Sequence, residues 1–181
     1  LPIDHTATKI IMNEVESIVP NEKMDIDLPG YAWDLLPYKK KPLDLYRAPM
    51  WHAEYDFEKR TPYASLQTSL GCQFGCNFCM INIINRNDKE EIGVASNYSK
   101  MRFWSPEFII KEFDKLINMG VRTIRIVDEM FLLNPKYYIP LCEKLAERNK
   151  DDSLRIWSYS RIDTVKRPEI LSLVRKAGIK W

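Results

Sequence analysis

Residues 63–79 of the chain read YASLQTSLGCQFGCNFC, a strand-like run followed at once by a loop rich in cysteine. The alternation of larger and smaller residues before the glycine predicts one β-strand over residues 63–70. The loop then places Cys72, Cys76 and Cys79 within eight positions. Disulfide frameworks spread cysteines along a chain, whereas clustered thiols without an export signal more often hold a metal or a cluster. The loop is therefore the first candidate for a functional site.

The sequence after the loop alternates helix and strand patterns. Ser105-Pro106-Glu107 is typical of a helix start, with a capping hydroxyl, a proline at the first helical position and an acid in the first turn. Apolar residues follow at helical spacing until Gly120. We expect strands over residues 121–127 and 154–160, and helices over 134–149 (beginning at Pro135 or at Pro140) and 168–177. Residues 179–181 read as the opening of a fourth strand.

This alternation predicts an α/β fold in which parallel strands are covered by helices. Functional residues of such sheets gather at the carboxyl ends of the strands. The cysteine loop follows the first strand, Asp128-Glu129 follow the second, and Ser160-Arg161 follow the third. We therefore expect thiols, carboxylates and a guanidinium to converge on one edge of the sheet.

The first third of the chain has a different character. Seven of the eleven prolines lie at or before Pro62, with tyrosines and tryptophans between them. Proline lacks a backbone donor, so this density argues against long helices and central strands, apart from a short helix over residues 10–19. We expect residues 1–61 to be a connector strapped across another surface, possessing no core of its own, and residues 62–181 to be the functional domain.

Composition narrows the classes of protein. The 181 residues suffice for one domain, and 27 basic against 25 acidic residues give a net charge of +2. That balance does not favour a nucleic acid or an acidic membrane as partner. No apolar run approaches the ~20 residues of a membrane span. The clustered thiols predict a reducing, cytoplasmic compartment, and the missing initiator methionine predicts a piece of a longer protein.

The cysteine spacing, C-x3-C-x2-C, favours an iron–sulfur cluster. A four-iron cluster held only by protein needs four thiolates, so three leave one iron open to a substrate or cofactor. Two alternatives remain open. One is a zinc site completed by a ligand from elsewhere in the chain, for which the candidates are His5, His52 and Cys142. The other is a ferredoxin-like electron carrier with Cys142 as the fourth cluster ligand.

Cys72-x3-Cys76-x-Phe78-Cys79, directly after a strand, resembles the signature of the radical SAM superfamily. The resemblance covers Pro62 to Trp181 and implies a partial (β/α) barrel with a [4Fe–4S] cluster on the three cysteines. It also implies that the open iron binds S-adenosylmethionine (SAM), which is cleaved reductively to a 5′-deoxyadenosyl radical. The implied partners are a small-molecule substrate or biosynthetic intermediate and an electron donor such as flavodoxin or ferredoxin.

Three further stretches resemble the cobalamin-binding members of that superfamily. Residues 28–37, LPGYAWDLLP, look like the connector before the core; residues 126–131 and 160–163 look like the ends of its second and third strands. The resemblance implies a cobalamin domain before residue 1 and reactions such as methyl transfer or ring formation. The chain departs from this group in two ways: it has no D-x-H-x-x-G cobalamin motif, and it supplies three strands and the start of a fourth where the barrel has six.

The same resemblance implies the residues that contact SAM. They are an aromatic residue beside the last cysteine, acids after the second strand, and a serine and an arginine after the third: Phe78, Asp128, Glu129, Ser160 and Arg161. Each has a plainer alternative. The acids could cap the turn into the next helix, and Arg161 could pair with Asp163 at the surface. Arg125 reads as solvated or structural, and Cys142 as a small buried apolar residue.

Overall fold

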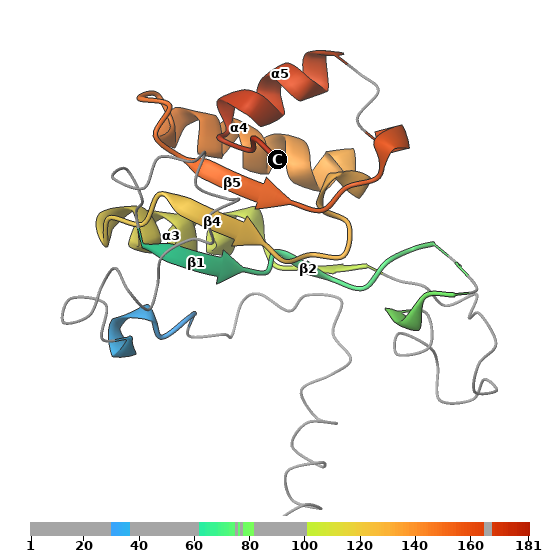
Figure 1. Cartoon of the computed structure of the whole chain (residues 1–181), viewed down its shortest axis with the longest axis horizontal. Helices are drawn as coiled ribbons and strands as arrows, with labels where there is room; N and C mark the ends of the chain where they lie inside the picture. The colour runs from blue at the N-terminus through green and yellow to red at the C-terminus, as the bar shows by residue number, and fades with distance from the viewer. Residues whose placement is uncertain (1–29, 37–61, 75, 77, 82–100, 165–167) are drawn as a thin grey trace, which may run out of the picture.

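The computed structural model describes residues 30–36, 62–74, 76, 78–81, 101–164 and 168–181. Three parallel strands form its sheet, in the order β1 (Tyr63–Leu66), β4 (Thr123–Ile126) and β5 (Arg155–Ser158). Helices α3 (Pro106–Asn118), α4 (Pro135–Arg148) and α5 (Pro168–Lys176) lie on one face of this sheet (Figure 1). The expected α/β fold is confirmed, and over the described residues the sheet is open, not a closed barrel.

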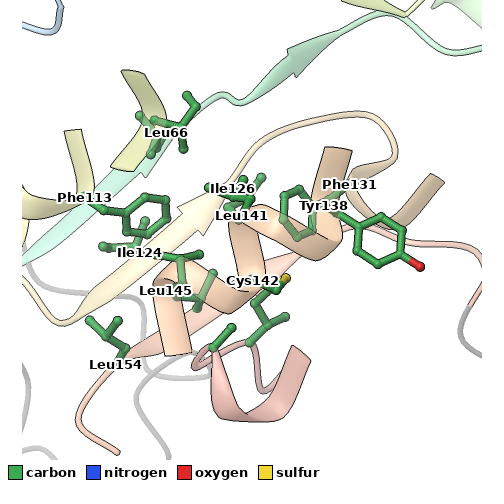
Figure 2. Packing of buried hydrophobic residues seen from close by; sticks show 14 of the residues in the cluster. Leu66, Phe113, Ile124, Ile126, Phe131, Tyr138, Leu141, Cys142, Leu145 and Leu154 are labelled. Atoms are coloured by element: carbon green, nitrogen blue, oxygen red, sulfur yellow. The ribbon is translucent and has the colours of Figure 1, made fainter. Parts of the chain in front are cut away.

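Strand alternation separates the two faces of the sheet. Side chains that point toward the helices are buried at alternate positions on all three strands: Ala64, Leu66, Ile124, Ile126 and Ile156. They pack against apolar residues of the helices, such as Phe113, Leu141 and Leu145 (Figure 2). The residues between them face the other way, and no described helix covers that face.

The predicted fourth strand has its opening beside β5. Ile179 forms a parallel bridge with Ile156, and Trp181 O accepts a hydrogen bond from Ser158 N at 3.0 Å. Residues 179–181 therefore extend the parallel sheet on the far side of β5 from β4, as the next strand of a (β/α) barrel would.

Helix starts follow the sequence signals. Ser105 Oγ accepts a hydrogen bond from Phe108 N at 3.1 Å and begins α3. Of the two starts considered for α4, the structure adopts Pro135, because Asn134 Oδ1 accepts from Lys136 N at 3.2 Å and caps the helix there. Pro140 lies inside this helix and removes one backbone donor. None of the helices in the described ranges has the length and apolarity that a membrane crossing requires.

The prediction of a single strand over residues 63–70 is wrong, because this stretch forms two separate strands. β1 ends at Leu66, and a second strand, β2 (Ser69–Leu70), pairs antiparallel with β3 (Arg102–Phe103). The backbone amides of the two residues between these strands bind side chains and not another strand. Gln67 N donates to Tyr31 Oη at 3.4 Å, and Thr68 N donates to Asp128. The β2–β3 ribbon therefore clamps the two ends of the segment that contains the cysteine loop.

Part of the expected connector lies against the domain. Residues 30–36 include a short 3-10 helix, η1 (Trp33–Leu35), and Tyr31 and Trp33 pack on the apolar core. Glu112 of α3 is buried and accepts hydrogen bonds from Trp33 Nε1 at 2.8 Å and from Tyr31 N at 3.3 Å. The strapping expected of this segment is thus seen at residues 30–36. The helix expected over residues 10–19 lies outside the described residues.

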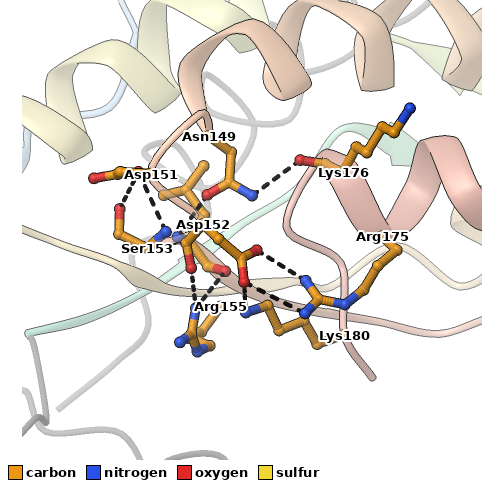
Figure 3. Close-up of polar contacts among 9 residues, drawn as sticks. Asn149, Asp151, Asp152, Ser153, Arg155, Arg175, Lys176 and Lys180 are labelled. Carbon is orange, nitrogen blue, oxygen red and sulfur yellow. Dashed lines mark hydrogen bonds and ion pairs between the residues drawn. The ribbon is translucent and has the colours of Figure 1, made fainter.

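Polar contacts fix the opposite, amino-terminal edge of the sheet (Figure 3). Asn149 accepts from Leu154 N at 2.8 Å and donates to Lys176 O at 2.9 Å, so it joins the end of α4 to β5 and to α5. Asp152 pairs with Arg175 at 2.9 Å and with Lys180 at 3.3 Å. These contacts hold the loop between α4 and β5 against the residues that follow α5.

Candidate functional site

The carboxyl ends of β1, β4 and β5 point toward the same side of the molecule (Figure 1). The cysteine loop extends on that side, as do two short 3-10 helices, η3 (Phe131–Leu133) after β4 and η4 (Ile162–Thr164) after β5. The convergence expected from the topology is therefore present.

The three clustered thiols lie on the loop at this edge, and their charges act on one another. Gly71 has a φ of +86°, which lets the chain turn from β2 into the loop, and Cys79 N donates to Cys76 O at 3.0 Å. Cys72 is buried, while Cys76 and Cys79 are partly exposed. Burial raises the pKa of the Cys72 thiol, and the negative charges of Cys79, Cys76 and Glu129 raise it further. A cationic group among these thiols would relieve that repulsion.

The described residues do not by themselves form a site for a single metal ion. Among the described residues, no three Cys, His, Asp or Glu side chains converge closely enough to hold one metal ion. A four-iron cluster needs a different arrangement, since each thiolate binds a different iron at a separate corner of the cube. Cys142, a candidate fourth ligand in both alternatives, is fully buried in the core on α4, between Leu141 and Leu145 (Figure 2). His5 and His52 lie outside the described residues.

Asp128 is tied to the base of the cysteine loop. Its carboxylate is fully buried and accepts from Thr68 N at 2.6 Å, Thr68 Oγ1 at 2.5 Å and Ser69 Oγ at 2.6 Å. Burial raises the pKa of Asp128, and the hydrogen bonds from Ser69 and Thr68 act in the opposite direction. The carboxylate thus serves the turn between β1 and β2, and it does not cap the segment that follows β4. The hydroxyls of Thr68 and Ser69, directly before the loop, are the sequence signal for this bond.

Glu129 has a different environment. Its Oε2 atom is buried and has no hydrogen-bond partner among the described residues. Its negative charge is the smallest of the causes that raise the pKa of the Cys72 thiol. A buried carboxylate oxygen without a donor is costly, and it is the expected state of a residue whose partner is a ligand.

Arg161 joins the end of β5 to the cysteine loop. Its Cζ lies 4.3 Å from the centroid of the Phe74 ring, a cation–π contact with a loop residue between Cys72 and Cys76. The guanidinium also forms a two-pronged pair with Asp163, with Nε–Oδ1 at 3.0 Å and Nη2–Oδ2 at 2.9 Å. That pair raises the pKa of Arg161, and the charges of Cys76 and Cys72 add to the shift. The surface pairing considered from the sequence is present, together with a contact to the loop that the sequence did not suggest.

The remaining expected residues are exposed. Ser160 Oγ shares a hydrogen bond with Thr164 Oγ1 at 2.7 Å. Phe78 is 93% exposed and Met80 is 68% exposed. Two large apolar side chains beside the cysteines thus have little cover among the described residues, which is the condition of a surface that receives a ligand or another part of the protein.

The family model of the radical SAM superfamily matches residues 66–181. The chain belongs to the radical SAM superfamily. No curated protein matches it. The matched range contains the three clustered cysteines, Glu129 and Arg161, so the edge described above is that of a radical SAM domain.

Two solved structures of one protein show the same fold. The radical SAM methyltransferase TsrM from Kitasatospora setae, solved with cobalamin and a [4Fe–4S] cluster, is 20% identical with a TM-score of 0.51. That match covers 70% of this chain and 22% of TsrM. A second TsrM structure, with tryptophan and a SAM analogue, is 18% identical with a TM-score of 0.51 and covers 65% and 20%. The cobalamin-dependent radical enzyme OxsB is 17% identical with a TM-score of 0.44, covering 93% and 24%. The chain thus spans about a fifth to a quarter of the length of these structures.

Proposed function

We propose that Cys72, Cys76 and Cys79 hold a [4Fe–4S] cluster and that the domain binds SAM at the cluster's open iron. When bound, this pair supplies one-electron cleavage of SAM to a 5′-deoxyadenosyl radical that takes hydrogen from a substrate. The observation that carries the proposal is the convergence of three thiols, Glu129 and Arg161 at one edge of the sheet. Membership of the superfamily supports it.

Residues of this chain would position the cofactors. Asp128 holds the turn before the loop and so fixes where Cys72 lies. We assign the positively charged amino group of SAM to Glu129, whose Oε2 lacks a donor, and not to Asp128, whose carboxylate is fully buried. The SAM carboxylate is assigned to Arg161, because a planar guanidinium binds a carboxylate through two hydrogen bonds. In this proposal SAM replaces Asp163, which now occupies Nε and Nη2 of Arg161. Ser160, next to Arg161, and Phe78, next to Cys79, are the other two residues proposed to contact SAM.

The structure bears on one of the two alternative functions, the electron carrier. A ferredoxin-like carrier needs a fourth thiolate, and burial of Cys142 raises its pKa to about 12, which opposes the ligand form. The zinc alternative includes His5 and His52 among its candidate ligands, and both lie outside the described residues. Both remain measurable outcomes: loss of the cluster in Cys142→Ala favours the carrier, and zinc without iron favours the module.

Substitutions at the two SAM contacts test the assignment. We expect Glu129→Gln and Arg161→Gln each to weaken SAM binding to the reconstituted protein by roughly ten- to a hundredfold, since each removes a charge-assisted hydrogen bond. Their iron content should stay at the level of the unmodified protein. The control for Glu129→Gln is Glu143→Gln, which removes the same negative charge at an exposed position of α4. Equal SAM affinity in all three variants would refute the assignment.

The intact protein's reaction is a further proposal. We infer a small-molecule substrate or biosynthetic intermediate, a cytoplasmic location and a reductant such as flavodoxin or ferredoxin. Cobalamin-dependent methyl transfer or ring formation is supported by the connector-like residues 28–37 and by the fold shared with TsrM. Within the chain, residues 1–61 are proposed to be the connector and residues 62–181 the radical SAM core. Reconstitution of a longer protein with hydroxocobalamin, followed by its absorption spectrum, tests the cobalamin part.

A further inference from the structure

The open face of the sheet carries a cationic and aromatic cluster. Arg125 on β4 is in register with Ser65 on β1 and Trp157 on β5, so the three side chains share the face that the helices leave free. Tyr159, one residue beyond β5, joins them through a hydrogen bond from Arg125. We call Arg125, Trp157 and Tyr159 the Arg125 platform. The helix-covered core and the site residues considered above do not include it.

The platform holds its guanidinium in a fixed orientation. The Cζ of Arg125 lies 4.4 Å from the Trp157 ring centroid and 5.4 Å from that of Tyr159. Its Nη2 donates to Tyr159 Oη at 3.0 Å, and the two rings contact each other at 4.8 Å between centroids. Stacking on both rings restrains the plane of the guanidinium, which is a favourable starting point for two-pronged recognition of an oxyanion.

The charge of the platform is not balanced by the described residues. Arg125 Nε is buried without a hydrogen-bond acceptor there, and no described carboxylate pairs with this guanidinium. Strand positions that share its face, residues 63, 65, 123, 155 and 157, include no acid. Arg155, also on that face, donates to the carbonyls of Asp152 and Leu154 instead. The guanidinium as a whole is half-buried and its Nη2 has Tyr159 as acceptor, so the unpartnered group among the described residues is the Nε donor. Buried donors in native proteins usually have a partner.

We propose that Arg125 binds an oxyanion of the substrate, a carboxylate or a phosphate, on the open face of the sheet. This inference rests on the proposed function, because it takes that face to be the inside of the radical SAM domain. Tyr159 lies two residues before Arg161, so the bound group would sit next to the site at the strand ends. Since Arg161 is assigned to SAM, Arg125 supplies a separate anchor, and it selects substrates that carry a negative group.

Anion titration of the reconstituted chain, with its cluster oxidised, tests the proposal. The signal to follow is the indole N–H resonance of Trp157, identified by its absence in Trp157→Phe. Inorganic phosphate and acetate are titrated in separate experiments, with chloride as the control for ionic strength. We expect phosphate or acetate to shift the resonance in a saturable way. A preference for one of the two tells a phosphate-bearing from a carboxylate-bearing substrate, and either supports the proposal.

Matched variants decide the role of Arg125. Arg125→Gln should raise the half-saturating anion concentration by roughly tenfold or more, because a charged hydrogen-bond donor is lost. Arg175→Gln removes the same charge at the opposite edge and should leave it unchanged. If Arg125→Gln does not fold, Arg125→Lys serves, since it keeps the charge and loses the planar fork; it too should bind more weakly.

Three results would overturn the proposal: no saturable shift with phosphate or acetate, equal shifts with chloride, or displacement of the anion by SAM, which would make Arg125 part of the SAM pocket. Iron content and SAM binding are measured on the same samples. If both are intact and the anion response is absent, only this inference fails. If the unmodified chain assembles no cluster, the proposed function fails, whatever the anion titration shows.

Discussion

Asp128 and Glu129 follow the same strand, yet their carboxylates meet opposite environments. Asp128 accepts three hydrogen bonds from Thr68 and Ser69, and it is closed off from solvent. Glu129 has a buried oxygen without a donor among the described residues, and its charge adds to the raised pKa of Cys72. The first acid therefore shapes the loop, and the second remains available to a ligand. Two adjacent acids thus have different roles: Asp128 positions the loop, and Glu129 is the residue that we propose binds a ligand.

Replacing Asp128 by alanine should destabilise the domain and disturb the cysteine loop. The substitution leaves Thr68 N and two buried hydroxyls without their acceptor, so we expect the free energy of unfolding to fall by about 3 kcal/mol. Iron bound after reconstitution should fall with it. Urea unfolding and iron analysis measure the two effects. Glu143→Ala, at an exposed position of α4, is the control; an Asp128→Ala protein that matches it in stability and iron content would contradict this role.

Cys142 should behave as an inert thiol. Burial raises its pKa to about 12 from an ordinary value of 9.0, so at pH 8 it is protonated inside the core. We expect iodoacetamide to leave Cys142 unmodified in the folded chain and to modify it once urea is added, as peptide mass spectrometry would show. Rapid modification of Cys142 in the folded chain would contradict its burial.

The same shift predicts a pH dependence of stability. The unfolded chain loses the Cys142 proton near pH 9, while the folded chain keeps it until about pH 12. Folding therefore binds a proton in this window, so the stabilisation present below pH 9 is lost as the pH rises toward 12, by up to about 1.4 kcal/mol per pH unit. Cys142→Ala should lack this component. Chemical unfolding of both proteins at a series of pH values measures it, and parallel curves would count against the shift.

At the scale of elements, Glu112 connects α3 to residues 30–36. Its carboxylate receives Trp33 Nε1, Tyr31 N and, at 2.7 Å, Lys115 Nζ. Gly30 is required beside it, because a Cβ there would lie 2.5 Å from Glu112 Oε1 and the φ of +90° disfavours other residues. A buried charge with three donors thus fixes the point at which the connector-like segment meets the helix layer.

Glu112→Ala should release residues 30–36 while the sheet stays folded. We expect a loss of about 2 kcal/mol in the free energy of unfolding, because Trp33 and Tyr31 lose their acceptor. Amide exchange in residues 30–36 should become faster, with little change in β4 and β5. Glu107→Ala, an exposed acid on the same helix, is the matched control. Unchanged exchange in residues 30–36 would show that Glu112 does not hold this segment.

At the scale of the whole molecule, the order of strands and helices could be predicted because periodicity and caps are local signals. Ser105 and Gly120, for example, mark the ends of α3 in the sequence itself. The break between β1 and β2 could not, since it depends on Asp128 and Tyr31, which lie 60 and 36 residues from the amides they bind. The Phe74–Arg161 contact was missed for the same reason. Contacts between residues far apart in the sequence produce no periodic pattern along it.

The open face of the sheet is the other feature that topology explains only in part. The alternation of the strands predicts which residues face it, but not that Arg125 stacks on Trp157 and Tyr159, because that depends on side-chain conformation. We propose that substrate binds on this face, next to the carboxyl edge that is proposed for SAM. The proposals for SAM and for substrate therefore both depend on a cluster with an open iron at the edge of the sheet.

Electron paramagnetic resonance of the anaerobically reconstituted, reduced chain, with and without SAM, tests that claim most directly. We predict a [4Fe–4S]⁺ signal whose shape changes when SAM is added, and its loss when Cys76 is replaced by alanine. Cys142→Ala should keep both the signal and the response. A cluster signal indifferent to SAM, or a protein that binds zinc and no iron, would contradict the account.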